Sequence, residues 1–125
     1  ELREYLRTKY SEICLDYRPL FLDCETNDPV ILKELYKNNI IAVSSLHNNC
    51  PLFPGHLNLQ FRITHDYIHL GHNLDFSYEG EFRVWEIQSN GLSDIAKKVL
   101  FSEIVLQAAY RLYFGKFPDQ KVILL

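Results

Sequence analysis

Residues 56–72 read HLNLQFRITHDYIHLGH, and this stretch decides the fold that we expect. Leu57, Phe61, Thr64 and Ile68 follow one another at spacings of four, three and four residues. This is the period of one face of an α-helix that lies against a core. The sequence therefore predicts a helix over the whole stretch, and the chain on both sides can be interpreted around it.

Helical signals precede this stretch. Apolar residues at spacings of three and four predict a first helix over residues 1–17, and the pair Arg18-Pro19 is expected to end it. Asp28 is suited to cap a second helix, with Pro29 in its first position. That short helix is expected to run as far as Asn38-Asn39.

Further elements are assigned by the same signals of capping, turns and apolar spacing. They are a loop over residues 44–55, an irregular connection over 73–80, a helix over 81–88 ended by Asn90-Gly91, a long helix from the cap Ser93 to about Phe114, and an apolar tail over 121–125. Strand signals are weak throughout. The sequence thus predicts an all-α fold, a bundle of about five helices forming one domain over residues 1–125.

The overall composition excludes several classes of protein. The net charge is −3 and the chain contains no basic block, so a nucleic-acid binder is not expected. No apolar run approaches the roughly 18 residues that a membrane span requires. We expect a soluble protein, cytoplasmic or peripheral on a membrane. The three cysteines lack metal-ligand spacing and are interpreted as free thiols in a reducing compartment.

His65 and His69 are the residues most indicative of chemistry. Four residues apart on a helix, their imidazoles project from the same face one turn apart, as in helices that supply two histidines to zinc. Asp66 borders that face and can bind the ion or orient a ligand. Glu81 follows a short connection, and Gly80 before it would permit an unusual backbone angle. The four residues His65, Asp66, His69 and Glu81 are the predicted metal ligands.

This spacing resembles a known pattern. His65-Asp66-x-x-His69, eleven residues and then Glu81 is similar to the HDxxH-x(11)-E signature of the Coq family of ubiquinone biosynthesis proteins, in particular its fourth member. Arg62, Gly71 and Gly80 also fit the local pattern of that family. So does the segment 88–92, although it follows Glu81 at a shorter distance than in members of the family. The resemblance covers residues 57–92, and the chain is about half the length expected for the family.

The resemblance implies an all-α fold and a metal, usually taken to be zinc, at the residues that match the signature. It also implies a groove for a polyprenylated quinone precursor, and a role in organising the biosynthetic complex and in removing the carboxyl group at C1 of the ring. From the ligand types alone, iron, manganese or cobalt are alternatives to zinc. In such a metal-dependent lyase, Asp66 or Glu81 would be a proton acceptor.

Other functions stay open at this point. One is a non-catalytic protein that binds a lipid or quinone and is stabilised by its metal, or a small bacterial or phage protein of unassigned role. Another is a metal-dependent hydrolase of the HD type, for which His47 and His56 would be weak additional ligands. A third is a structural module of a larger assembly in which the histidines cluster incidentally.

Two polar residues of the last predicted helix have an open role. Glu103 and Gln107 lie four apart among apolar neighbours. They could join the metal site, as a ligand or as an acceptor for a ligating histidine, or they could lie on the exposed side of the helix. Glu79 and Glu86 are interpreted as surface residues.

Overall fold

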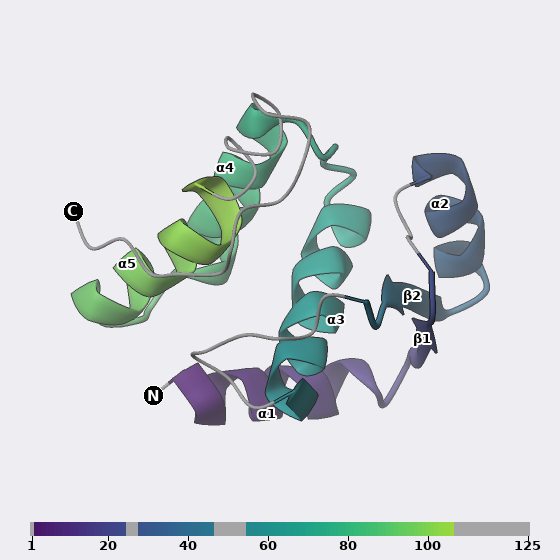
Figure 1. The fold of residues 1–125 in the computed structure, drawn as a ribbon, viewed down its shortest axis with the longest axis horizontal. Coiled ribbons are helices and arrows are strands. Elements are labelled where there is room, and N and C mark those ends of the chain that lie inside the picture. The colour runs from purple at the N-terminus through teal and green to yellow at the C-terminus, as the bar shows by residue number, and fades with distance from the viewer. Residues whose placement is uncertain (1, 25–27, 47–54, 107–125) are drawn as a thin grey trace.

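A computed structural model describes residues 2–24, 28–46 and 55–106 of the chain. In these ranges the order of elements begins with helix α1 (Leu2–Ile13), strand β1 (Arg18–Leu22), helix α2 (Pro29–Lys37) and strand β2 (Ile40–Ser44). It continues with helix α3 (Gly55–Gly71), helix α4 (Tyr78–Gln88), helix α5 (Asp94–Phe101) and the π-helical turn η1 (Ser102–Leu106) (Figure 1).

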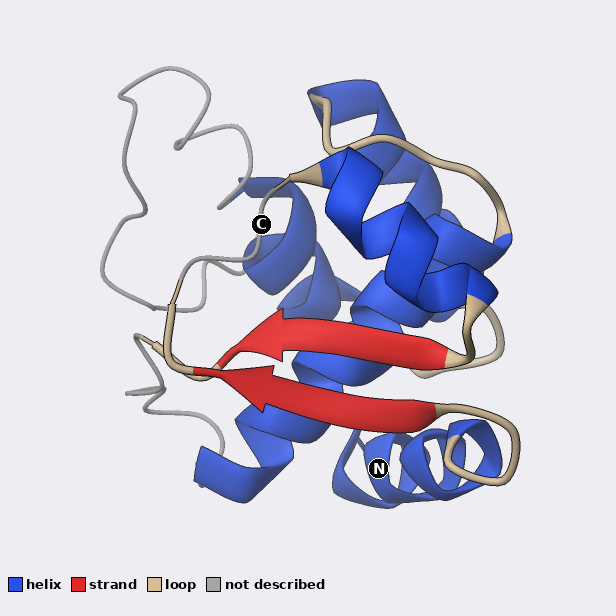
Figure 2. Ribbon diagram, turned by 90° about the vertical axis from the view of Figure 1, so that its right-hand side faces the viewer, coloured by secondary structure: helices blue, strands red, loops and turns tan. Residues whose placement is uncertain are grey.

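The prediction of an all-α fold is wrong, because β1 and β2 form a parallel two-stranded sheet (Figure 2). Arg18 pairs with Ile40 and Leu22 with Ser44, and α2 connects the strands. The fold is therefore mostly helical with a βαβ unit near its start. Pro19 lies in β1, where a missing N–H is tolerated because only one side of the strand is paired in the described part of the sheet.

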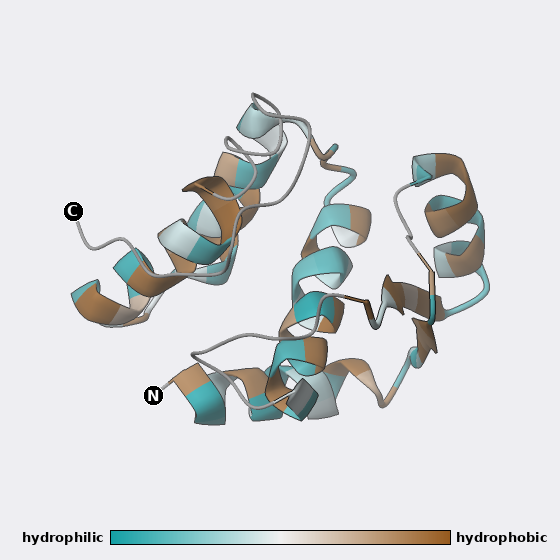
Figure 3. Cartoon of the chain, in the orientation of Figure 1, coloured by the Kyte–Doolittle hydropathy of each residue, from teal (hydrophilic) through white to brown (hydrophobic). Residues whose placement is uncertain are grey.

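β2 gave no alternating pattern in the sequence because its three central residues are all buried, whichever face of the strand they lie on. Both α2 and α3 pack against it, and its three central residues, Ile41, Ala42 and Val43, are buried. In such a strand consecutive residues are apolar, so apolar and polar residues do not alternate along the sequence. An apolar run this short also cannot be distinguished from part of a buried helix by its periodicity. Both strands are mainly hydrophobic in Figure 3, whereas polar and apolar residues alternate around α3.

The helix caps were predicted better than the helix ends. Asp28 accepts a hydrogen bond from the backbone N–H of Val30, and Ser93 accepts one from that of Ala96, so both predicted caps are confirmed. The first helix ends at Ile13 rather than at Tyr17. The fourth begins at Tyr78, three residues earlier than predicted.

Beyond Leu106 the prediction of a helix to Phe114 lies outside the described residues, as do the tail 121–125 and most of the loop 44–55. Within the described ranges, no helix is both long enough and apolar enough to cross a membrane.

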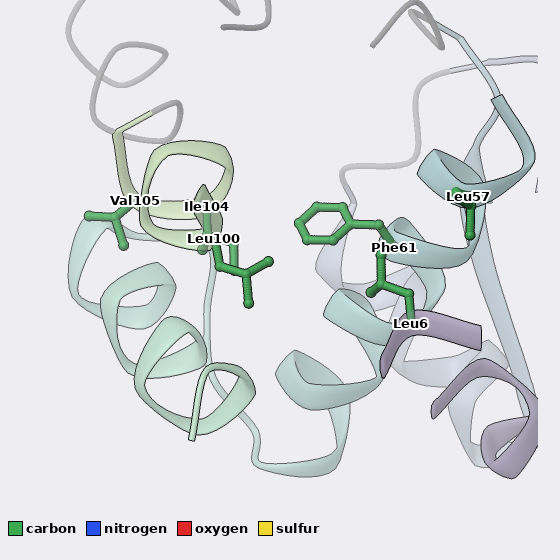
Figure 4. Packing of buried hydrophobic residues seen from close by; sticks show 6 residues of the cluster. All are labelled: Leu6, Leu57, Phe61, Leu100, Ile104 and Val105. Atoms are coloured by element: carbon green, nitrogen blue, oxygen red, sulfur yellow. The ribbon is translucent and has the colours of Figure 1, made fainter. Parts of the chain in front are cut away.

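Two hydrophobic clusters meet at α3. One joins Leu57 and Phe61 of α3 to Leu6 of α1 and to the residues Leu100, Ile104 and Val105 (Figure 4). The other joins Ile63 of α3 to Ile13 of α1 and to β2. α3 is thus fixed along its length by core packing, and its remaining face, with His65 and His69, is directed towards α4.

Candidate metal centre

The two histidines of α3 lie as their spacing predicts. Their rings are neighbours, with centroids 4.6 Å apart and planes at 80°. Phe61 stacks on the His65 ring at 5.7 Å, and Phe76 lies against the His69 ring at 4.5 Å. The imidazoles are therefore held in place by aromatic neighbours as well as by their helix.

Glu81 reaches this pair from the first turn of α4. Ser77 caps that helix by accepting a hydrogen bond from the backbone N–H of Gly80, and Asp75 accepts one from the backbone N–H of Ser77. These short-range bonds fix the direction in which α4 starts after α3. The positive end of the helix dipole also favours a carboxylate in this turn.

Gly80 is needed for close packing rather than for its backbone angle. It does not have a positive φ, in contrast to Gly91 at +85°, so the expectation of an unusual angle at Gly80 is wrong. A Cβ atom at Gly80 would instead lie 2.1 Å from the backbone oxygen of Asp75. Because Gly80 has no side chain, the first turn of α4 packs directly against the backbone of Asp75. Glu81 is the next residue in that turn.

Three side chains converge at the centre of the site. The Glu81 carboxylate lies 2.9 Å from Nε2 of His65 through one oxygen and 3.1 Å from Nε2 of His69 through the other. The two Nε2 atoms are 3.1 Å apart. All three side chains are shielded from water, with side-chain exposures of 14% for His65, 0% for His69 and 8% for Glu81.

The opposite nitrogen of each ring faces a hydrogen-bond acceptor. Nδ1 of His69 lies 3.2 Å from the carbonyl oxygen of Leu74, and Nδ1 of His65 lies 3.4 Å from Oε1 of Gln88. A carbonyl oxygen cannot donate, so these two contacts favour the neutral tautomer with its hydrogen on Nδ1. Both Nε2 atoms then present their lone pairs to the centre, which is the arrangement of histidines that bind metals.

Charge and burial shift the pKa values of the site. Burial alone would raise the pKa of Glu81, but the neighbouring His65 and His69 outweigh it and lower the pKa to about 2. Burial opposes the charged form of His65, yet the Glu81 carboxylate raises its pKa above the ordinary value. Without a metal, the site therefore holds a carboxylate and favours an imidazolium at His65.

Asp66 lies beside the cluster rather than in it. His65, His69 and Glu81 each offer an atom within 4.8 Å of the other two, and among the described residues these three form the group that could hold a metal ion. Asp66 does not belong to that group. Burial raises its pKa to about 6, although His65 and His69 act in the opposite direction. Its role as a fourth ligand or proton acceptor stays a prediction.

The other candidate residues are placed as follows. Glu103 is buried, with 7% exposure, but it does not join the described metal-binding group. His56 is exposed, as are Glu79 and Glu86. His47 and Gln107 lie outside the described residues.

Two partners of the site were not predicted from the sequence. The Leu74 carbonyl is a backbone atom, and no sequence pattern shows where it points. Gln88 is different, because it lies seven residues after Glu81 and so on the same face of α4. That spacing could have identified it as a residue facing His65.

Comparison of the chain with protein-family models, with curated protein sequences and with solved structures finds no match in any of the three. The arrangement of His65, His69 and Glu81 is therefore the basis for assigning a function.

Proposed function

We propose that this protein binds one divalent metal ion through Nε2 of His65, Nε2 of His69 and the carboxylate of Glu81. A single observation carries the proposal: Nε2 of His65, Nε2 of His69 and the Glu81 carboxylate meet at separations of 2.9 to 3.1 Å, while each Nδ1 faces an oxygen acceptor. Lone pairs at such separations repel one another unless a cation or a proton lies between them.

The burial of the cluster makes a cation the better explanation. A buried acceptor without a partner costs free energy, and a buried carboxylate costs more. One divalent ion satisfies all three groups at once, whereas a single proton on His65 leaves the lone pair of His69 facing the same carboxylate. Two histidines and one carboxylate are also the protein ligands of many catalytic zinc sites.

Zinc is the ion we assign first, with iron, manganese and cobalt as alternatives that the same ligands accept. Three protein ligands leave a coordination position for water or substrate, or for Asp66 from the adjoining helix position. When bound, such an ion would act as a Lewis acid towards a carboxylate or phenolate oxygen. Asp66, with its pKa raised to about 6, would exchange a proton near neutral pH.

The spacing HDxxH-x(11)-E supports a finer proposal, in which the protein acts on or organises a polyprenylated quinone precursor of ubiquinone biosynthesis. In that role it would be a lyase that removes the C1 carboxyl group of the ring. This part of the proposal rests on the motif and its resemblance alone.

A structural ion in a non-catalytic protein that binds lipid or quinone is the second candidate. The observation in its favour is the low exposure of the ligands, since His69 is completely covered. Closed sites are typical of metals that stabilise a fold.

The experiment is metal analysis of protein purified without an affinity tag, before and after incubation with Zn²⁺ and removal of the excess. His69→Ala is the test variant and His72→Ala the matched control, because His72 is an exposed histidine three residues further along the chain. We expect about one ion per chain in the wild type and in His72→Ala, and little in His69→Ala. Metal far below one ion per wild-type chain after incubation would overturn the proposal.

Two further measurements separate the two roles. A large fall in melting temperature after chelation supports a structural ion, since binding to the native state adds stability. Mass spectrometry of lipid extracted from the purified protein tests the quinone proposal, which predicts a prenylated aromatic compound. An extract without one, in protein that carries its metal, would argue against a quinone ligand.

A further inference from the structure

A chain of hydrogen bonds leads from the backbone of α3 to the ring of His65. The Thr64 hydroxyl donates to the carbonyl oxygen of Phe61 at 2.9 Å. The Gln88 amide nitrogen donates to the Thr64 oxygen at 3.5 Å, and Oε1 of the same amide lies 3.4 Å from Nδ1 of His65. The chain therefore crosses from α3 to α4 and returns to a proposed metal ligand.

The hydroxyl of Thr64 determines which group donates in each bond of this chain. The hydroxyl of Thr64 has one hydrogen, which Phe61 receives, so towards Gln88 its oxygen can only accept. Only the NH₂ group of Gln88 can donate there, and its oxygen is consequently turned to His65. The last two contacts are long for hydrogen bonds. Through their polarity, these contacts favour one orientation of the ring and a hydrogen on its Nδ1.

Because the side chains of Gln88 and Thr64 are buried, water does not replace their hydrogen bonds. Gln88 is 1% exposed and Thr64 is 3% exposed. The backbone of Gln88 is held independently, because the Tyr5 hydroxyl of α1 donates to its carbonyl oxygen at 2.8 Å. A substitution of the Gln88 side chain leaves that bond in place, so the effect on His65 can be tested separately from the anchoring of α4.

Glu81 acts on the His65 tautomer in the opposite sense. Its carboxylate, 2.9 Å from Nε2, favours a hydrogen on that nitrogen in the neutral ring. A hydrogen on Nε2 excludes a metal from the same lone pair. The Gln88 oxygen instead favours the hydrogen on Nδ1 and leaves Nε2 free.

We infer that Gln88, oriented by Thr64, is a positioning residue that selects the metal-binding tautomer of His65. This inference rests on the proposed function and names a residue through which the metal affinity is set. Partners of this kind contribute about ten- to hundred-fold to metal affinity where they have been removed.

The experiment compares the wild type with Gln88→Leu, Gln88→Glu, Thr64→Val and Thr64→Ser. Gln88→Leu removes the acceptor, and Gln88→Glu retains an acceptor and strengthens it with a charge. Thr64→Val removes the hydroxyl that orients the amide, and Thr64→Ser keeps it. Zn²⁺ affinity is measured by competition with a chromophoric chelator. The tautomer of His65 is measured by ¹H–¹⁵N NMR of the metal-free protein, at a pH where both rings are neutral.

We expect Gln88→Leu to bind Zn²⁺ about ten- to hundred-fold more weakly, with Gln88→Glu at or above the wild-type affinity. The share of neutral His65 rings with the hydrogen on Nδ1 should be larger in the metal-free wild type than in Gln88→Leu, where Glu81 alone acts on the tautomer. A merely structural role for Gln88 would not move the tautomer. If Gln88→Leu does not fold, Thr64→Val should show the same change and Thr64→Ser should not.

An unchanged tautomer in Gln88→Leu and in Thr64→Val would overturn the inference, whatever the metal affinities are. A wild type that binds no Zn²⁺ but shows the shift in tautomer would instead contradict the proposed metal site and leave the orienting effect of Gln88 established. The two failures are thus distinguishable.

Discussion

Glu81 is the one negatively charged member of the cluster of His65, His69 and Glu81, and its replacement tests how far charge holds the site together. Glu81→Gln keeps the shape of the side chain but removes the charge that both imidazoles face. We expect Zn²⁺ affinity to fall by about a hundred-fold or more, since a ligand is lost outright. Glu86→Gln is the matched control, because the same change falls on an exposed residue of the same helix. Equal affinities in the two variants would exclude Glu81 as a ligand.

Gly80 permits a prediction that is independent of metal. In Gly80→Ala the new Cβ atom would lie 2.1 Å from the Asp75 backbone oxygen, so the backbone must move. We expect a loss of about 1–3 kcal/mol in the free energy of unfolding, measured in urea. Gly71→Ala is the control, because its Cβ atom would meet only the Tyr36 hydroxyl at 3.4 Å. A similar, small effect in both variants would show that Gly80 is not required by packing.

The sequence predicted the centre of the site but not its surroundings. The separation of four residues between His65 and His69 is local, and a helix converts it directly into proximity. Glu81 was also identified, because its connection to α3 is short. The spacing of Gln88 from Glu81 puts both on one face of α4, but the contact of Gln88 with His65 depends on how α4 packs against α3, and the Leu74 carbonyl depends on a turn. Such longer-range geometry has no pattern in the residues themselves.

At the scale of elements, the helices were predicted and the strands were not. α2, α3 and α5 each carry a cap or an apolar stripe, and these signals are contained in the residues of the helix itself. β1 and β2 are five residues each and depend on pairing with one another across α2. β2, whose three central residues are all buried, lacks the alternating pattern by which strands are recognised. The βαβ unit therefore became visible only in three dimensions.

The caps of α4 and α5 provide a matched pair of variants. Ser77→Ala and Ser93→Ala each remove a side-chain acceptor from a helix start, so each should cost about 1 kcal/mol of stability in urea unfolding. Only Ser77→Ala frees the turn that carries Glu81. We therefore expect Zn²⁺ affinity to fall in Ser77→Ala and to stay unchanged in Ser93→Ala. A loss of affinity in both would mean that general stability, rather than the position of Glu81, is being measured.

At the scale of the whole molecule, the proposed ion would join two groups of elements. α1, the sheet and α3 share one hydrophobic cluster, while α4 packs with α5 and η1 (Figure 1). The cluster around Leu57 and Phe61 already connects α3 with α5 and η1, so the ion would add a second link. His65 and His69 belong to the first group and Glu81 to the second. Metal bound at the three residues would thus stabilise the packing of α4 against α3.

Stability should depend on pH in opposite ways with and without metal. The pKa of His65 is raised on folding, so its contribution is fully present below the unfolded value of 6.5 and is lost as the pH rises through the folded pKa. The pKa of Glu81 is lowered to about 2, so its contribution is present above 4.5 and is lost as the pH falls towards 2.

Without metal, the pair should therefore stabilise the protein most in mildly acidic solution. With Zn²⁺ the order reverses, because protons compete with the ion for the imidazoles. We expect the rise in melting temperature caused by Zn²⁺ to grow as the pH increases from about 6 to about 8. Melting scans over this range check it, and a rise that is independent of pH would exclude imidazole ligands.

The most direct test of the metal site is anomalous X-ray scattering from crystals of the untagged protein grown with Zn²⁺, measured on both sides of the zinc absorption edge. The predicted result is one strong anomalous peak within bonding distance, about 2.0–2.2 Å, of Nε2 of His65, Nε2 of His69 and a carboxylate oxygen of Glu81. An ordered cluster without a peak, with the three side chains joined directly by hydrogen bonds as in a site held by protons, would contradict it.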